Sequence, residues 1–141
     1  MATTGSLAQW HCGREYSDIC TLFLLNAVSV DVLSRRQIYD ETLKLCAERQ
    51  GPINPTMARL YFNKAIVYED EAIETGNTDT YGHAYDYYKK AYVASRETLG
   101  KEHSKTVKYR GILAQPTYAW FSDRRHENID ALVTDQVLGI A

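Results

Sequence analysis

The side chains in this chain with the greatest capacity for chemistry are three cysteines, four histidines and a run of carboxylates. His11, Cys12 and Cys20 are close enough in sequence to suggest a zinc site. Structural zinc requires four ligands, however, and no fourth ligand follows at a suitable spacing. The sequence therefore predicts no metal site.

A cysteine nucleophile is the second chemistry that these residues could supply. Cys12 or Cys46 would need His83 or His103 as a base, yet no motif of a cysteine enzyme accompanies them. The chain contains no glycine-rich phosphate loop, no GxSxG and no HExxH. The consecutive carboxylates at 69–71 are interpreted as a solvated helix surface. We therefore expect a non-enzymatic protein with no cofactor.

Composition favours a single globular domain. The chain has 141 residues, 45% hydrophobic and 24% charged, with a formal net charge of −2. This charge argues against nucleic acid as a partner. No apolar run approaches the roughly 18 residues of a membrane span, and the N-terminus does not resemble a secretory signal. Three cysteines without a CxxC pair fit a reducing compartment, so we expect no membrane partner and a cytoplasmic protein.

Hydrophobic periodicity predicts helices throughout, after a loose N-terminus at residues 1–14. A first helix is expected from about Glu15, or from Ser17 if that residue is the N-cap, and a second over 34–50 with Gly51 as its end. Asn54 and Pro55 are typical of a cap and a first helical residue, and they predict a third helix. The polar segment 74–81 is expected to be a break.

The later helices are predicted from their terminators. The fourth helix is expected to run to Leu99 before Gly100, and the fifth to start near Ser104 and to kink or stop at Pro116. Residues 127–138 are expected to form a short last helix. With no convincing strand, the pattern predicts an all-α fold of about six helices in antiparallel hairpins.

An internal repeat supports this organisation. A shift of 49 positions places Gly51 on Gly100 and Tyr39 on Tyr88. The stretch TYGHAYDYYKKAYVASRETLGKEHSKTV (80–107) resembles the second helix and connector of a kinesin-light-chain-type tetratricopeptide repeat, and RLYFNKAIVYED (59–70) resembles its first helix. The resemblance implies a short right-handed array in one domain, clearest over 54–103, with 104–141 as a degenerate or capping repeat.

The small and aromatic positions of that family have counterparts here. Tyr61, Ala65 and Tyr68 match the first helix, and Ala84, Tyr88 and Ala91 match the second. Small residues let the helices of a hairpin approach closely, and aromatic rings fill the space between hairpins. The chain departs from the family by an insertion of about seven residues within the central repeat, and by Pro116.

The resemblance also implies a binding groove, because the first helices of successive hairpins line the concave side of such arrays. The residues implied to face it are Arg59, Phe62, Asn63, Ile66 and Asp70, followed by Lys108, Ile112 and Gln115. In the family, an asparagine at the position of Asn63 contacts the backbone of a bound peptide. Arg59 and Lys108 could hold an acidic group of a ligand. Alternatively, both are solvated surface charges and Asn63 bonds a neighbouring helix.

The aromatic residues outside this groove allow two interpretations. Tyr85, Tyr88 and Tyr92 share one helix face and are predicted to pack in the core, whereas Tyr81 and Tyr87 are predicted to be exposed. Three aromatic residues that follow Pro116 either cover the end of the core or form an exposed docking patch: Tyr118, Trp120 and Phe121.

These expectations favour a scaffold or adaptor that binds a protein or peptide through the concave groove. The alternative is a structural subunit held permanently in a larger assembly, since such arrays usually need about three repeats for stability. The family resemblance implies cargo linkage or a cytoskeletal association for either role.

Overall fold

The computed structural model describes residues 32–140, and all their regular structure is helical, with no strand. The all-α prediction is therefore confirmed for this part of the chain. The first predicted helix, the loose N-terminus, and His11, Cys12 and Cys20 lie outside the described residues. The helices are α3 (Val32–Gln50), α4 (Pro55–Thr75), α5 (Thr78–Leu99), α6 (Ser104–Leu113), α7 (Pro116–Arg124), the 3-10 turn η1 (Ile129–Ala131) and α8 (Thr134–Leu138).

Local capping explains most of these boundaries. The Asn54 side chain accepts a hydrogen bond of 2.9 Å from the Met57 amide, and Pro55 opens α4. Gly51 ends the preceding helix with a φ of +84°, which glycine adopts without the steric cost of a Cβ. Pro116 is the first residue of α7, so the helix that begins at Ser104 stops at Leu113. These four predictions are confirmed.

The connection between α4 and α5 is shorter than the sequence predicts. In place of the polar break expected over residues 74–81, only Gly76 and Asn77 lie outside the helices. Gly76 takes the left-handed conformation, and the Asn77 side chain accepts a 2.9 Å hydrogen bond from the Asp79 amide. One closing glycine and one capping asparagine therefore suffice for the turn. The extra residues of this segment lengthen the two helices instead of forming a loop.

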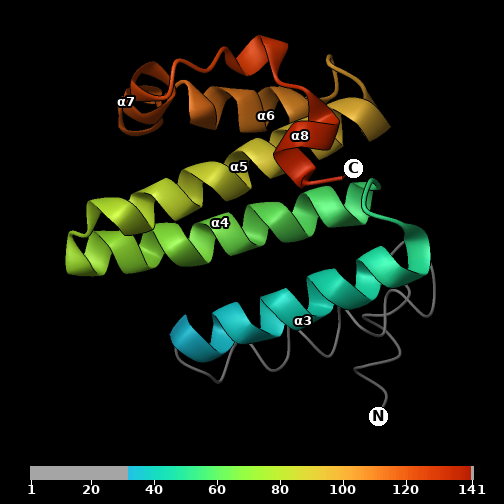
Figure 1. The fold of residues 1–141 in the computed structure, drawn as a ribbon, viewed down its shortest axis with the longest axis horizontal. Coiled ribbons are helices and arrows are strands. Elements are labelled where there is room, and N and C mark those ends of the chain that lie inside the picture. The colour runs from blue at the N-terminus through green and yellow to red at the C-terminus, as the bar shows by residue number, and fades with distance from the viewer. Residues whose placement is uncertain (1–31, 141) are drawn as a thin grey trace.

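From α3 to α6, successive helices alternate in direction around the α4–α5 hairpin (Figure 1). Figure 1 shows α3 on one side of the hairpin, with α6 and α7 on the other side. Six alanines on the two hairpin helices are almost fully buried: Ala58, Ala65, Ala72, Ala84, Ala91 and Ala94. Their small side chains let the two helices pack closely. The predicted core tyrosines, Tyr85, Tyr88 and Tyr92, are buried as expected.

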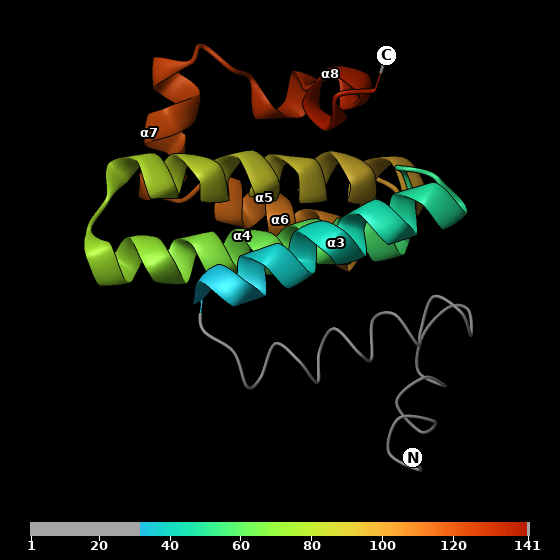
Figure 2. The same ribbon diagram turned by 60° about the horizontal axis from the view of Figure 1, so that its bottom comes forward.

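The chain returns over α5 after α7 ends. We call residues 125–140, which include η1 and α8, the C-terminal strap. Figure 2 shows α7 and α8 on the outer side of α5, away from α3 and α4. His126 at the start of the strap has a φ of +54°.

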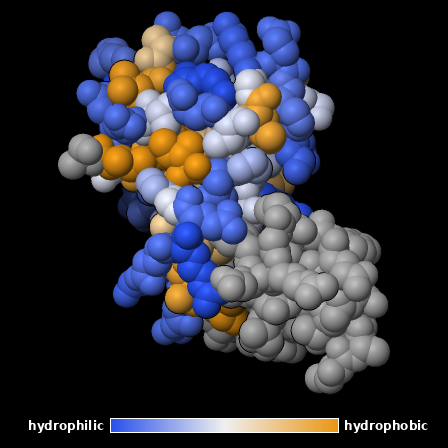
Figure 3. All heavy atoms as spheres, turned by 90° about the vertical axis from the view of Figure 1, so that its right-hand side faces the viewer, coloured by the Kyte–Doolittle hydropathy of each residue, from blue (hydrophilic) through white to orange (hydrophobic). Residues whose placement is uncertain are grey.

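The surface of the described helices is mixed in polarity. In a view of one end of the molecule, hydrophobic side chains form small patches separated by hydrophilic ones (Figure 3). Among residues 32–140, no helix combines the length and hydropathy needed to cross a membrane.

Candidate functional site

An aromatic pair joins two of the helices that were implied to line the groove. The rings of Phe62 on α4 and Tyr109 on α6 are stacked, with centroids 4.9 Å apart and an interplanar angle of 28°. The Phe62 ring also lies 5.9 Å from Tyr88 on α5. We call the surface around this pair the α4–α6 face; it consists of Arg59, Phe62, Asn63, Ile66, Lys108, Tyr109 and Ile112.

Two cations flank this aromatic pair. The Lys108 ammonium lies 4.7 Å from the centre of the Phe62 ring. The Arg59 guanidinium acts on Tyr109 from the other helix: burial raises the pKa of the Tyr109 hydroxyl, and the positive charge of Arg59 partly opposes this rise. No ion pair within the described part of the chain involves Arg59 or Lys108. Both charges can therefore pair with an external carboxylate.

The remaining predicted groove residues are less closely connected. Asn63 is half-buried, and its carboxamide forms no hydrogen bond with residues 32–140. Ile66 is 36% exposed, and Ile112 packs against the core cluster. Asp70 and Gln115 lie outside the core. The structure therefore brings Arg59, Phe62 and Lys108 together with Tyr109, and the groove itself stays a prediction.

The periodicity of α6 could have identified Tyr109. It lies directly after Lys108 and three residues before Ile112, so the same helix carries all three side chains. The family resemblance does not single it out, because that pattern points to residues expected at the surface and Tyr109 is almost fully buried. The ring of this buried tyrosine stacks against the ring of Phe62.

The prediction of an exposed docking patch after Pro116 is wrong for two of its three residues. Tyr118 and Phe121 are buried: the Tyr118 ring lies 5.1 Å from Tyr88, and the Phe121 ring lies 5.5 Å from Tyr85. They cover the end of the core, which was the other interpretation. Trp120 alone is exposed, at 45%, with the Arg124 guanidinium 4.6 Å from its ring.

The prediction that Tyr81 and Tyr87 are exposed is also wrong. Both are partly buried and pack against the core. The Tyr87 hydroxyl accepts a hydrogen bond of 2.9 Å from Lys64, and its ring stacks on Tyr68 at 5.6 Å. Burial is the main reason that its pKa is raised to about 12. Helical spacing within α5 could not reveal that side chains from α4 cover Tyr87.

Lys64 is the most unusual charged residue of the described core. It is only 2% exposed, and its ammonium contacts the Asp40 carboxylate and lies 4.4 Å from the centre of the Tyr87 ring. Desolvation, assisted by the positive charges of Lys90 and Arg36, lowers the Lys64 pKa to about 8. The Asp40 carboxylate that contacts this ammonium is itself 59% exposed.

This buried lysine predicts a pH dependence of stability. Between pH 8 and 10.5 the unfolded chain binds more protons at Lys64 than the folded chain, so stability contributed by this site rises with pH. From pH 7 to pH 9, we expect wild type to gain about 1 kcal/mol of unfolding free energy relative to Lys64→Met. Urea unfolding at the two pH values measures this. An equal change in both proteins would contradict the lowered pKa, since their tyrosines titrate alike.

The side chains considered above as a nucleophile and as its base include Cys46 and His103, which both lie within the described residues. Cys46 is fully buried on α3. The His103 Nδ1 atom caps α6 by accepting a hydrogen bond of 3.1 Å from the Lys105 amide. Among residues 32–140, no cluster of three or more histidine, cysteine or acidic side chains could hold a metal ion.

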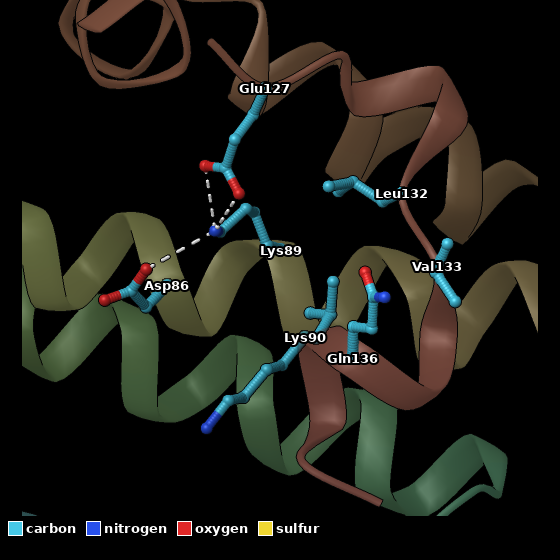
Figure 4. Close-up of a pocket in the computed structure, with 8 residues that line it drawn as sticks. Asp86, Lys89, Lys90, Glu127, Leu132, Val133 and Gln136 are labelled. Atoms are coloured by element: carbon cyan, nitrogen blue, oxygen red, sulfur yellow. Dashed lines mark hydrogen bonds and ion pairs between the residues drawn. The ribbon is translucent and has the colours of Figure 1, made fainter. Parts of the chain in front are cut away.

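A cavity of about 380 Å³ lies between α5 and the C-terminal strap. Its lining residues are Asp86, Lys89 and Lys90 from α5 and Glu127, Leu132, Val133, Gln136 and Val137 from the strap. In Figure 4 the Lys89 side chain points toward the Glu127 carboxylate, while the Lys90 ammonium points away from it. Lys89 also lies 3.5 Å from Asp86, so two carboxylates of the chain compensate its charge.

Two places thus gather groups suited to binding: the α4–α6 face, with two cations beside an aromatic pair, and the cavity beneath the strap, with its charged groups. The tetratricopeptide resemblance stays a prediction. When the chain is compared with models of known families, with curated proteins and with solved structures, none of them matches it.

Proposed function

We propose that this protein is a non-catalytic interaction module that binds an acidic peptide segment of a protein partner along the α4–α6 face. The observation that carries the proposal is the position of Arg59 and Lys108, two cations without an acidic partner in the described chain, beside the stacked rings of Phe62 and Tyr109. Surface cations usually remain solvated, but cations beside an aromatic surface can bind a carboxylate and an apolar group together.

The geometry of the face suits an extended peptide. Arg59 presents a planar guanidinium that can bind a carboxylate with two parallel hydrogen bonds. Asn63 lies one helical turn further along α4, and its carboxamide can both donate to and accept from a peptide main chain. Phe62 and Ile66 supply apolar contact area between these polar groups.

The architecture supports a scaffold role. The hairpin of α4 and α5 is followed by a second pair of helices, α6 and α7, and buried alanines and tyrosines fill the hairpin core. We infer that the hairpins stack in the tetratricopeptide manner, with α4 and α6 as the first helices of successive units. The 9-residue length of α7 and the return of the strap over α5 suit the end of such an array.

A peptide-display selection tests this function and needs no identified partner. We expect wild type to enrich peptides with at least one Asp or Glu next to an apolar residue. Arg59→Glu combined with Lys108→Glu is expected to weaken binding of the selected peptides by about 100-fold, because each reversal replaces attraction with repulsion. Isothermal titration calorimetry with one selected peptide measures the loss.

The matched control carries the same change of charge elsewhere. Lys44→Glu combined with Arg124→Glu alters two exposed cations on α3 and α7 and is expected to retain the wild-type affinity. Circular dichroism establishes that both double variants remain helical. If the two double variants lose affinity equally, net charge rather than the α4–α6 face determines binding, and the proposal is wrong.

A further inference from the structure

Aromatic and basic side chains form a stripe along α5. Tyr85, Lys89, Tyr92 and Arg96 are separated by four, three and four residues, so they lie on one helix face. Each cation lies over a ring: the Lys89 ammonium is 4.7 Å from the centre of Tyr85, and the Arg96 guanidinium is 5.5 Å from the centre of Tyr92. We call these four residues the α5 stripe.

The C-terminal strap contacts this stripe through polar atoms. The Glu127 carboxylate accepts hydrogen bonds from the Tyr85 hydroxyl at 2.9 Å and from the Lys89 ammonium at 2.9 and 3.0 Å. Arg96 donates to the Leu132 carbonyl oxygen at 2.7 Å and to the Thr134 hydroxyl at 3.1 Å. The strap therefore binds the stripe as a peptide ligand would, with one carboxylate and one main-chain carbonyl five residues later.

Charge complementarity accompanies these contacts. Residues 127–140 carry three carboxylates, those of Glu127, Asp130 and Asp135, and no lysine or arginine, whereas Arg125 at the start of the strap pairs with Asp86 of α5 at 2.6 Å. Asp130 adds an ion pair of 2.7 Å to Arg110 on α6. An acidic segment thus lies on a basic and aromatic surface, and ionic strength should weaken their contact because part of it faces solvent.

The attachment of the strap combines these polar contacts with moderate apolar burial. Ile129 is buried, and Leu132, Val137 and Leu138 pack partly buried against the core, whereas Val133 is exposed. The cavity of about 380 Å³ separates part of the strap from α5. At the start of the strap, His126 adopts a left-handed backbone conformation that is unfavourable for a residue with a Cβ. Release would relax this residue but expose these apolar side chains, so a partner must cover the same surface to displace the strap.

We infer that the α5 stripe is a second docking surface and that the C-terminal strap is its releasable intramolecular ligand. The partner that fits is an acidic segment of another protein, with a carboxylate for Tyr85 and Lys89 and a main-chain carbonyl for Arg96. This surface lies on the strap side of α5, so it is separate from the α4–α6 face and does not depend on the function proposed for that face.

A labelled peptide of residues 125–140 tests the inference on the full chain. The tethered strap competes with the peptide at a high effective concentration, so wild type should bind it weakly. Glu127→Gln in the chain removes one of the charges that hold the strap, and we expect the peptide to bind this variant about tenfold more tightly than wild type. Fluorescence anisotropy measures both affinities, and circular dichroism shows whether the variant keeps its helices.

Three controls make the outcome decisive. Asp123→Asn, which neutralises an exposed carboxylate of α7, should leave the weak binding of wild type unchanged. A peptide that itself carries Glu127→Gln should bind the Glu127→Gln chain more weakly than the unaltered peptide does. When Arg96→Ala is added to the Glu127→Gln chain, the unaltered peptide should bind this double variant more weakly than it binds the Glu127→Gln chain. The inference is overturned if Glu127→Gln and Asp123→Asn chains bind the peptide equally, or if the altered peptide binds as well as the unaltered one.

Discussion

Replacing Tyr88 by alanine is expected to lower the free energy of unfolding by about 3–5 kcal/mol. The Tyr88 ring is almost fully buried on α5, where it lies 5.9 Å from Phe62 of α4 and 5.1 Å from Tyr118 of α7. Truncation removes contacts that join three helices, and surrounding rings cannot collapse fully into the space. Urea unfolding followed by far-ultraviolet circular dichroism measures the loss.

The matched variant Tyr88→Phe separates the ring from its hydroxyl. The Tyr88 hydroxyl donates a hydrogen bond to the Glu69 carboxylate, and burial together with this acceptor raises the Tyr88 pKa far above its ordinary value. Removal of the hydroxyl alone should cost about 1.5 kcal/mol, well below the loss for alanine. Equal losses for both variants would show that the hydrogen bond, not ring packing, dominates at this position.

Ala91→Leu is expected to destabilise the protein by about 2–3 kcal/mol although it adds hydrophobic surface. Ala91 is fully buried on α5, in the hairpin where α4 and α5 pack most extensively. Leucine has no space there without displacing the neighbouring side chains or helices, because interiors are packed as densely as organic crystals. Thermal and urea unfolding measure the effect.

An alanine at the surface provides the control for this substitution. Ala114 is exposed after the end of α6, so Ala114→Leu should change the free energy of unfolding by less than about 0.5 kcal/mol. A neutral or stabilising result for Ala91→Leu would mean that the two hairpin helices do not approach as closely as their buried alanines indicate.

The helix boundaries that depend on local chemistry could be predicted from the sequence. Each of these boundaries depends on a residue that acts on its own backbone or on neighbours a few positions away, so its effect is visible in the sequence. These residues are Asn54 with Pro55, Gly51 and Pro116. The break expected at 74–81 is wrong because the ends of these two helices depend on contacts between the helices and not on local chemistry. Its polar residues are compatible with both turn and helix, and only packing of α4 against α5 decides how far each helix extends.

The residues of the two candidate surfaces also differ in whether the sequence could group them. The grouping of Arg59, Phe62 and Lys108 depended on the tetratricopeptide resemblance, which stays a prediction, because no local pattern relates α4 to α6. No pattern relates Lys89 to Glu127, which lies 38 residues away and belongs to a segment predicted only as a short helix. The burial of Tyr118 and Phe121 likewise depends on their contact with α5, which no periodicity within α7 can indicate.

The two-residue turn at Gly76 and Asn77 also bears on how the chain folds. It joins helices of 21 and 22 residues, so the hairpin pairs residues close in sequence and closes a minimal loop. The entropy cost of closing so short a loop is small, which favours fast formation of the α4–α5 hairpin. The strap instead contacts α5 across 38 residues of chain, from Lys89 to Glu127, so its contacts close a longer loop at a larger entropy cost. The same chain thus combines a hairpin of local contacts with a segment attached by distant ones.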